Sequence, residues 1–101
     1  MRVELTGRHI EITPALRRLV DRKLAKLERL LNDRALSAQA VLTKERYRHR
    51  ANITLHARGE RLLHGVGAKA TWATSLTEAV GKITHQAQKV TGKWRARKRR
   101  G

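Results

Sequence analysis

The chain has 101 residues, enough for one domain with a modest core and too few for two. Its 24 Lys and Arg residues against 8 Asp and Glu give a net charge of +16, which favours binding to phosphate polyanions or anionic membranes. The absence of cysteine excludes disulfides, thiol catalysis and cysteine-based zinc sites. No apolar run approaches the roughly 20 residues of a transmembrane helix, and the N-terminus lacks the apolar core of a signal peptide. We therefore expect a cytoplasmic protein without a membrane partner.

Residues 2–10 open with alternating polar and apolar side chains, which predicts a strand that Gly7 ends or bulges. Thr13 and Pro14 form a typical helix start, because a threonine hydroxyl caps free backbone N–H groups and proline at the first helical position loses no hydrogen bond. We predict a helix over residues 14–31 that stops at Asn32. One face of this helix is apolar and consists of Leu16, Leu19, Val20, Leu24, Leu27, Leu30 and Leu31.

The same helix separates its charges by sign. Asp21 and Glu28 lie on one flank of the apolar face. Lys23 lies inside the apolar arc, where its alkyl stem can pack while its ammonium reaches solvent. A further face carries only cations, and these are Arg18, Arg22, Lys26 and Arg29.

Three more strands are predicted over residues 38–44, 50–58 and 61–68, after a loop at 33–37. In the middle strand Ala51, Ile53, Leu55 and Ala57 alternate with polar residues, which favours an antiparallel sheet with one covered face. Residues 58–60 form a tight turn. Gly65 and Gly67 share a face of the last strand and would let a helix backbone approach closely. A strongly basic connection over residues 45–49 precedes the middle strand. Four cations of this hairpin would add to one positive surface around Tyr47, and these are Lys44, Arg46, Arg48 and Arg50.

The last thirty residues predict a second amphipathic helix. Thr71 can cap it, and Ser75 with Glu78 forms a competing capping box. Its apolar stripe is Leu76, Val80, Ile83, Ala87, Val90 and Trp94. A second stripe, rotated away from the first, is Lys82, Gln86, Lys89 and Lys93. We expect one domain over residues 1–94 and a flexible basic tail over 95–101.

The predicted order is β-α-β-β-β-α, an α+β two-layer sandwich with two helices on one face of a four-stranded sheet. Two cationic helix stripes and a basic connection make phosphate binding the favoured interpretation over solvated helix faces. Two interpretations of Tyr47 stay open, stacking on an exposed base or packing on its own hairpin. For Trp72 we favour packing, whereas Trp94 can pack or stack on a base.

Several segments together resemble the bacterial hibernation-promoting factor and ribosome-associated inhibitor family, in its short form. These segments are TGRHIEITPALR at 6–17, KLAKLE at 23–28, TKERYRHRANITLHARGERLLHG at 43–65 and GKITHQAQK at 81–89. The last is similar to the family pattern D-K-L-x-R-Q-L-x-K, with His85 in place of the usual arginine. The chain departs from the family before the last helix, where Thr71, Trp72 and Ala73 replace an acidic Asp-Met-Tyr-like segment.

The resemblance implies a fold similar to double-stranded-RNA-binding domains and binding to the small ribosomal subunit, in the channel shared by mRNA and tRNA. It also implies inhibition of translation in starved or stationary cells. The partners would be the small subunit and its rRNA, without a small-molecule substrate or cofactor, and we expect a monomer when free. The predicted rRNA-binding residues are Arg18, Arg22, Lys23, Lys26, Arg29, Lys44, Arg46, Tyr47, Arg48, Lys82, His85, Gln86, Lys89 and Lys93.

Other functions have less support in the sequence. A generic double-stranded-RNA-binding module or ribosomal protein is the main alternative, followed by a DNA-binding architectural protein. We do not expect an enzyme, because no catalytic triad, paired carboxylates, Walker loop or dinucleotide fingerprint is present. His56 and His64 could be neighbours across a hairpin, but the five histidines lack metal-ligand spacing, so we expect no metal site.

Overall fold

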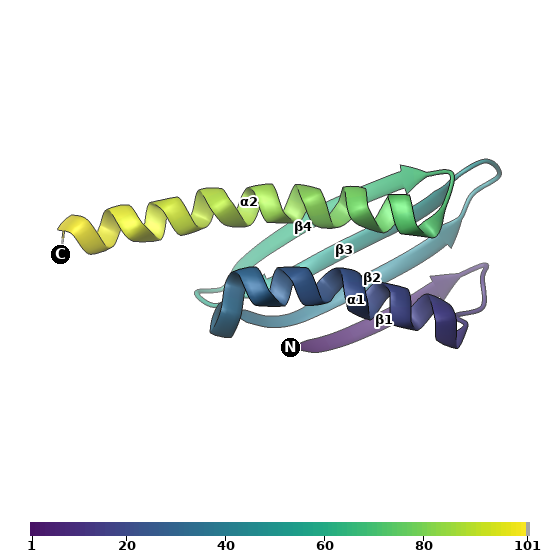
Figure 1. The fold of residues 1–101 in the computed structure, drawn as a ribbon, viewed down its shortest axis with the longest axis horizontal. Helices are drawn as coiled ribbons and strands as arrows, with labels where there is room; N and C mark the ends of the chain where they lie inside the picture. Colours follow the sequence, from purple (N-terminus) through teal and green to yellow (C-terminus); the bar gives the residue numbers. More distant parts are fainter. Residues whose placement is uncertain (101) are drawn as a thin grey trace.

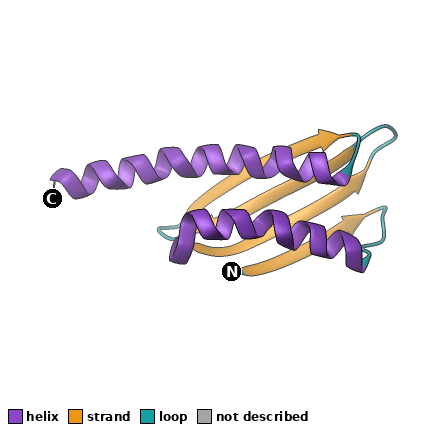
Figure 2. Ribbon diagram, viewed as in Figure 1, coloured by secondary structure: helices purple, strands orange, loops and turns teal. Residues whose placement is uncertain are grey.

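The computed structural model describes the backbone of residues 1–100 and the side chains of residues 1–32 and 34–89. Two helices lie side by side on one face of a four-stranded sheet, and the other face of the sheet is open (Figures 1 and 2). This confirms the predicted α+β sandwich and its β-α-β-β-β-α order. The elements are β1 (Arg2–Arg8), α1 (Pro14–Leu31), the 3-10 turn η1 (Asn32–Arg34), β2 (Ala35–Lys44), β3 (His49–Ala57), β4 (Arg61–Lys69) and α2 (Trp72–Arg100).

The sheet has the order β1-β2-β3-β4 and is mixed rather than wholly antiparallel. Strands β2, β3 and β4 are joined by hairpins and pair antiparallel. Strand β1 pairs parallel to β2, because α1 carries the chain back across the sheet between them. The expectation of an antiparallel sheet is therefore wrong at β1. Gly7 does not end this strand, since it pairs with Leu42 inside the ladder.

Helix α1 has the predicted bounds. The Leu16 N–H donates to the Thr13 hydroxyl at 3.1 Å, and Pro14 occupies the first helical position. Asn32 ends the helix with a φ of 52°, and its N–H donates to the carbonyl of Glu28. Leu30 is 42% exposed and does not join the core, because it lies at the margin of the apolar arc whose centre is held by Leu27.

Strand β2 begins three residues earlier than residue 38, the predicted start. Ala35 already pairs with Ala57, and the register then shifts between Ala35 and Ser37. This irregularity leaves Leu36 half exposed and breaks the alternation of polar and apolar residues. The pattern in the sequence therefore becomes regular only from Ala38 onwards, and the predicted loop at 33–37 shrinks to η1.

The two glycines of β4 let α2 lie directly on the sheet, as predicted. A Cβ at Gly67 would stand 1.8 Å from the carbonyl oxygen of Ser75, and a Cβ at Gly65 would stand 2.3 Å from that of Ala79. Only glycine fits at such an approach of backbone to backbone. The core between the layers is aliphatic and includes Leu24, Leu27, Ile53, Leu55, Leu76 and Ile83.

Helix α2 starts at Trp72 with Thr71 as its cap, since the Thr74 N–H donates to the Thr71 hydroxyl at 3.2 Å. Its backbone continues to Arg100, whereas the sequence analysis ends the helix near Trp94. Arginine, lysine and alanine are strong helix formers, and no proline interrupts this segment. The expected flexibility of residues 95–101 stays a prediction, and the side chains of Val90, Lys93 and Trp94 lie outside the described residues.

Candidate nucleic-acid interface

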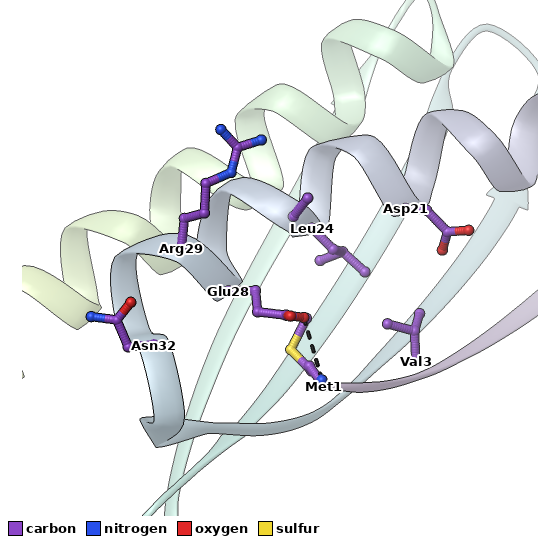
Figure 3. Close-up of a pocket in the computed structure, with 8 residues that line it drawn as sticks. Met1, Val3, Asp21, Leu24, Glu28, Arg29 and Asn32 are labelled. Atoms are coloured by element: carbon purple, nitrogen blue, oxygen red, sulfur yellow. Dashed lines mark ion pairs between the residues drawn. The ribbon is translucent and has the colours of Figure 1, made fainter.

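The cationic face of α1 is directed away from β1. Glu28 pairs with the amino group of Met1 at 3.4 Å, and Asp21 lies with Val3 along an open hollow of about 550 Å³ (Figure 3). This acidic flank therefore faces β1, which places the opposite flank on the side of α2. Lys23 is half-buried there, as expected for a packed alkyl stem. The four residues of the predicted cationic face are exposed, and these are Arg18, Arg22, Lys26 and Arg29.

The connection between β2 and β3 forms a compact tip. The Glu45 N–H donates to the carbonyl of Arg48 at 2.9 Å, and the Arg50 guanidinium pairs with the Glu45 carboxylate. This pair lowers the pKa of Glu45, chiefly through the hydrogen bond from Arg50. The tip exposes Tyr47, which is 82% accessible, together with Lys44, Arg46 and Arg48.

The basic stripe of α2 lies over the free edge of β4. The Lys82 ammonium donates to the carbonyl of Val66 at 2.7 Å. The Gln86 amide bonds twice to His64, accepting from its N–H at 3.1 Å and donating to its carbonyl at 2.7 Å. The sequence predicts that Lys82 and Gln86 contact RNA. In the structure both also have a role in the fold, because they form hydrogen bonds with backbone groups that an edge strand leaves without a strand partner.

Two more side chains of α2 continue this row toward the start of the helix. The Glu78 carboxylate accepts from the Ala68 N–H at 3.0 Å and pairs with the Lys69 ammonium at 3.2 Å. The fully buried Ser75 accepts from the Lys69 N–H at 2.9 Å and shares its own proton between the carbonyls of Thr71 and His49. We call this set the β4-edge row, and it consists of Ser75, Glu78, Lys82 and Gln86.

Sequence reasoning missed the β4-edge row, although its spacing of three, four and four residues is a signal for one side of a helix. The apolar stripe indicates which face of a helix is buried, but it does not indicate which neighbour each flank meets.

The β4-edge row has a direct consequence for the candidate interface. Gln86 has both amide groups engaged by His64, whereas Lys82 keeps two of its three N–H donors, and His85 and Lys89 are exposed.

The cations thus form three groups around the helical layer. The first follows α1, the second occupies the β2–β3 tip, and the third follows α2 above the β4 edge. Thr77 and Gly81 of α2 are exposed and uncharged. Their helical spacing places them on the flank of the apolar stripe opposite Lys82, so this flank of α2 is neutral there. The single positive surface that the sequence predicts for these cations stays a prediction.

Substitution of Glu78 by glutamine should lower the melting temperature at neutral pH and have no effect in acid. Bonding to the Ala68 N–H, with the Lys69 ion pair, lowers the pKa of Glu78 below its ordinary 4.5. Because the pKa of Glu78 is lower in the folded than in the unfolded protein, its carboxylate stabilises the fold above about pH 4.5. This stabilisation is lost as the pH falls through the pKa of the folded state. Thermal melts of both proteins from about pH 7 down to about pH 2 test this. A difference that stays constant over that range would contradict it.

The histidines do not converge. His64 pairs with Thr54 in the ladder and its Nε2 lies 2.6 Å from the Asn52 amide oxygen, while His56 is opposite Leu62. Among the residues that the structure describes, no three His, Cys, Asp or Glu side chains lie close enough to hold a metal ion. In that same part of the chain, neither helix combines the length and apolarity needed to cross a membrane.

His49 and Trp72 mark the place where the chain departs from the family pattern. Their rings meet edge to face, with centroids 4.7 Å apart and planes at 82°. The ring of Trp72 packs against the core, which confirms the packing interpretation. Thr71 caps α2, and the first turn of this helix holds no acidic residue.

Comparison with known proteins fixes the family. Residues 3–95 match the model described as "Sigma 54 modulation protein / S30EA ribosomal protein". The chain belongs to this family. Among S30EA relatives, the "Ribosome hibernation promoting factor" of Escherichia coli strain K12 is 33% identical over 89 residues, which cover 88% of this chain and 92% of that protein. The protein of the same name from Azotobacter vinelandii is 35% identical over 63 residues, covering 62% and 58%.

Two solved structures share the fold. The N-terminal domain of Thermus thermophilus Protein Y aligns with a TM-score of 0.79 and 29% identity, covering 89% of this chain and 99% of that domain. A "ribosomal subunit interface protein" from Coxiella burnetii aligns with a TM-score of 0.80 at 17% identity, covering 91% and 99%, and this likeness concerns the fold alone.

Proposed function

We propose that this S30EA protein is a ribosome hibernation factor. In this proposal residues 1–94 bind small-subunit rRNA in the channel for mRNA and tRNA and inhibit translation in starved or stationary cells. The protein acts in the cytoplasm, is a monomer when free, and needs neither a cofactor nor a small-molecule substrate. The names of its relatives support ribosome hibernation. The single structural observation that carries the proposal is the cationic layer on the helical side of the sheet.

The charge arrangement supports RNA as the partner. On α1, the acidic residues Asp21 and Glu28 lie on the β1 side, whereas Arg22 is exposed on the cationic face. Lys89 extends the positive charge on α2. Unpaired cations of this kind bind phosphate with release of counterions, so the affinity for small subunits should fall steeply with salt.

The proposal predicts that cations on the helices matter more than cations elsewhere. Arg22→Glu with Lys89→Glu removes two phosphate contacts and should lower the slope of log affinity against log salt by about two units. The matched control is Arg2→Glu with Arg8→Glu, which changes the net charge equally on β1 and should retain most binding. Lys82 is left unchanged because its substitution would also open the β4 edge.

Co-sedimentation of the purified variants with small subunits, at several salt concentrations, measures both effects. Circular dichroism establishes that each double variant is folded. If the two double variants bind equally well, the net charge alone accounts for the affinity. The assignment of RNA binding to the cations of the two helices then fails.

Two further measurements test the place and the consequence of binding. Occupation of the small subunit by mRNA and P-site tRNA should prevent binding if the site lies in their channel. Wild-type protein should inhibit cell-free translation, and the helix variant should not. Equal affinity for free duplex RNA and for small subunits would favour a generic double-stranded-RNA-binding module instead.

A further inference from the structure

The tip between β2 and β3 presents a largely exposed aromatic ring. Tyr47 is 82% exposed, more than Leu30, Leu36 and Leu62, the other exposed large hydrophobic residues of the described part of the chain. The hairpin tip extends past the start of α2 (Figure 1). Exposure on this scale argues against the interpretation in which the ring packs on its own hairpin.

Three contacts hold the tip and its base in the fold. A backbone hydrogen bond of 2.9 Å closes the turn from Glu45 to Arg48, and the Arg50–Glu45 ion pair braces its base. Just beyond, the His49 carbonyl accepts from the buried Ser75 hydroxyl at the start of α2. The base of the tip is therefore attached to the start of α2.

We propose that Tyr47 is a stacking platform for an unpaired RNA base, an inference that rests on the RNA binding proposed above. Tyr47 lies between Arg46 and Arg48 in the sequence, and the Arg46 guanidinium lies 6.0 Å from the centroid of its ring. Aromatic rings stack on unpaired bases while neighbouring cations contact the phosphates of the same strand. The one acidic residue of the tip, Glu45, is already paired with Arg50, so it does not oppose a phosphate.

The same surroundings disfavour insertion of Tyr47 into an apolar pocket of a protein. Such insertion would take Arg46 and Arg48 out of water without providing opposite charge. A single-stranded RNA segment could contact both parts of the tip. One of its bases would stack on the Tyr47 ring, and its phosphates would contact the guanidinium groups of Arg46 and Arg48. A regular duplex would offer only its phosphates, because its bases are stacked on one another.

Three substitutions at one position test the stacking role, with small subunits and short single-stranded and duplex RNA oligonucleotides as probes. Tyr47→Ala should weaken binding to small subunits and to single-stranded RNA about 5- to 150-fold, and should leave duplex binding unchanged. Tyr47→Phe keeps the ring and should bind like the wild type. Tyr47→Leu keeps the apolar surface without the π face and should behave like alanine. The slope against salt should be the same for all, because the ring carries no charge.

Leu62→Ala is the matched control, since it truncates another exposed large side chain away from the tip. Equal affinity of the alanine and phenylalanine variants for both single-stranded RNA and small subunits would overturn the proposal. Retention of binding by Tyr47→Leu would overturn stacking in favour of a simple apolar contact. If the wild type failed to bind small subunits, the proposed function would fall, whereas the comparison on single-stranded RNA would still decide the role of Tyr47.

Discussion

Replacement of Gly67 by alanine is expected to lower the free energy of unfolding by about 3 kcal/mol or more, at or beyond the upper end of overpacking effects. The new methyl carbon would stand 1.8 Å from the Ser75 carbonyl oxygen and 2.8 Å from its carbonyl carbon. Both are backbone atoms of α2, so no side-chain rotation can relieve the contact. The helix must move away from β4, which also pulls the β4-edge row off the strand.

Gly81→Ala provides a control for this prediction with the same chemical change. Gly81 is an exposed residue within α2, and a Cβ built there meets no atom within 4 Å. Alanine favours the helix over glycine by about 0.8–1.0 kcal/mol, so this variant should be more stable than the wild type. Urea denaturation of both variants measures the two opposite changes. A Gly67→Ala protein as stable as the wild type would show that α2 does not rest on β4 in this way.

Truncation of Leu27 to alanine is expected to cost about 2–5 kcal/mol, from lost transfer free energy and the cavity that remains. Leu27 is fully buried and Leu24 is 1% exposed, both at the centre of the α1 face against the sheet. The same cost is expected at Leu24. For a domain of this size such a loss lowers the melting temperature by about 8 °C or more, which thermal melts detect directly.

Leu30→Ala is the corresponding control on the same helix. Leu30 is 42% exposed, so its truncation should change stability by no more than about 0.5 kcal/mol. Equal effects at Leu27 and Leu30 would mean that α1 is rotated relative to the sheet. The pair of variants therefore tests the orientation of the helix, which also determines where the cations of α1 point.

Most of the fold could be predicted because its signals are local. Thr13, Pro14 and Asn32 define both ends of α1 through capping chemistry that needs no tertiary contact. The alternation around Ile53 and the glycines of β4 likewise indicate which face is covered. The direction of β1 could not be read in this way, because alternation gives the side on which residues point and not the polarity of the neighbouring strand.

The candidate site was predictable only in part, for a similar reason. A helical wheel separates Lys82 and Lys89 from the apolar stripe correctly, yet it treats both as solvent-facing. The structure shows that the Lys82 ammonium donates to the Val66 carbonyl of the β4 edge, a contact that the wheel does not indicate. The engagement of Gln86 with His64 depends on a contact between residues far apart in the sequence, which periodicity cannot register.

Lys82 illustrates what its contact with the β4 edge means for ligand capture. A free lysine side chain samples many rotamers, and immobilising such a chain on binding costs about 0.5–1.5 kcal/mol. The bond from its ammonium to the Val66 carbonyl restricts those rotamers when the protein folds, before any ligand arrives. A phosphate that approaches this side of α2 thus meets a charge whose conformational entropy is already reduced, with two N–H groups still free to donate. The side chain of Lys82 thus both protects the edge of β4 and holds a cation in place before a ligand binds.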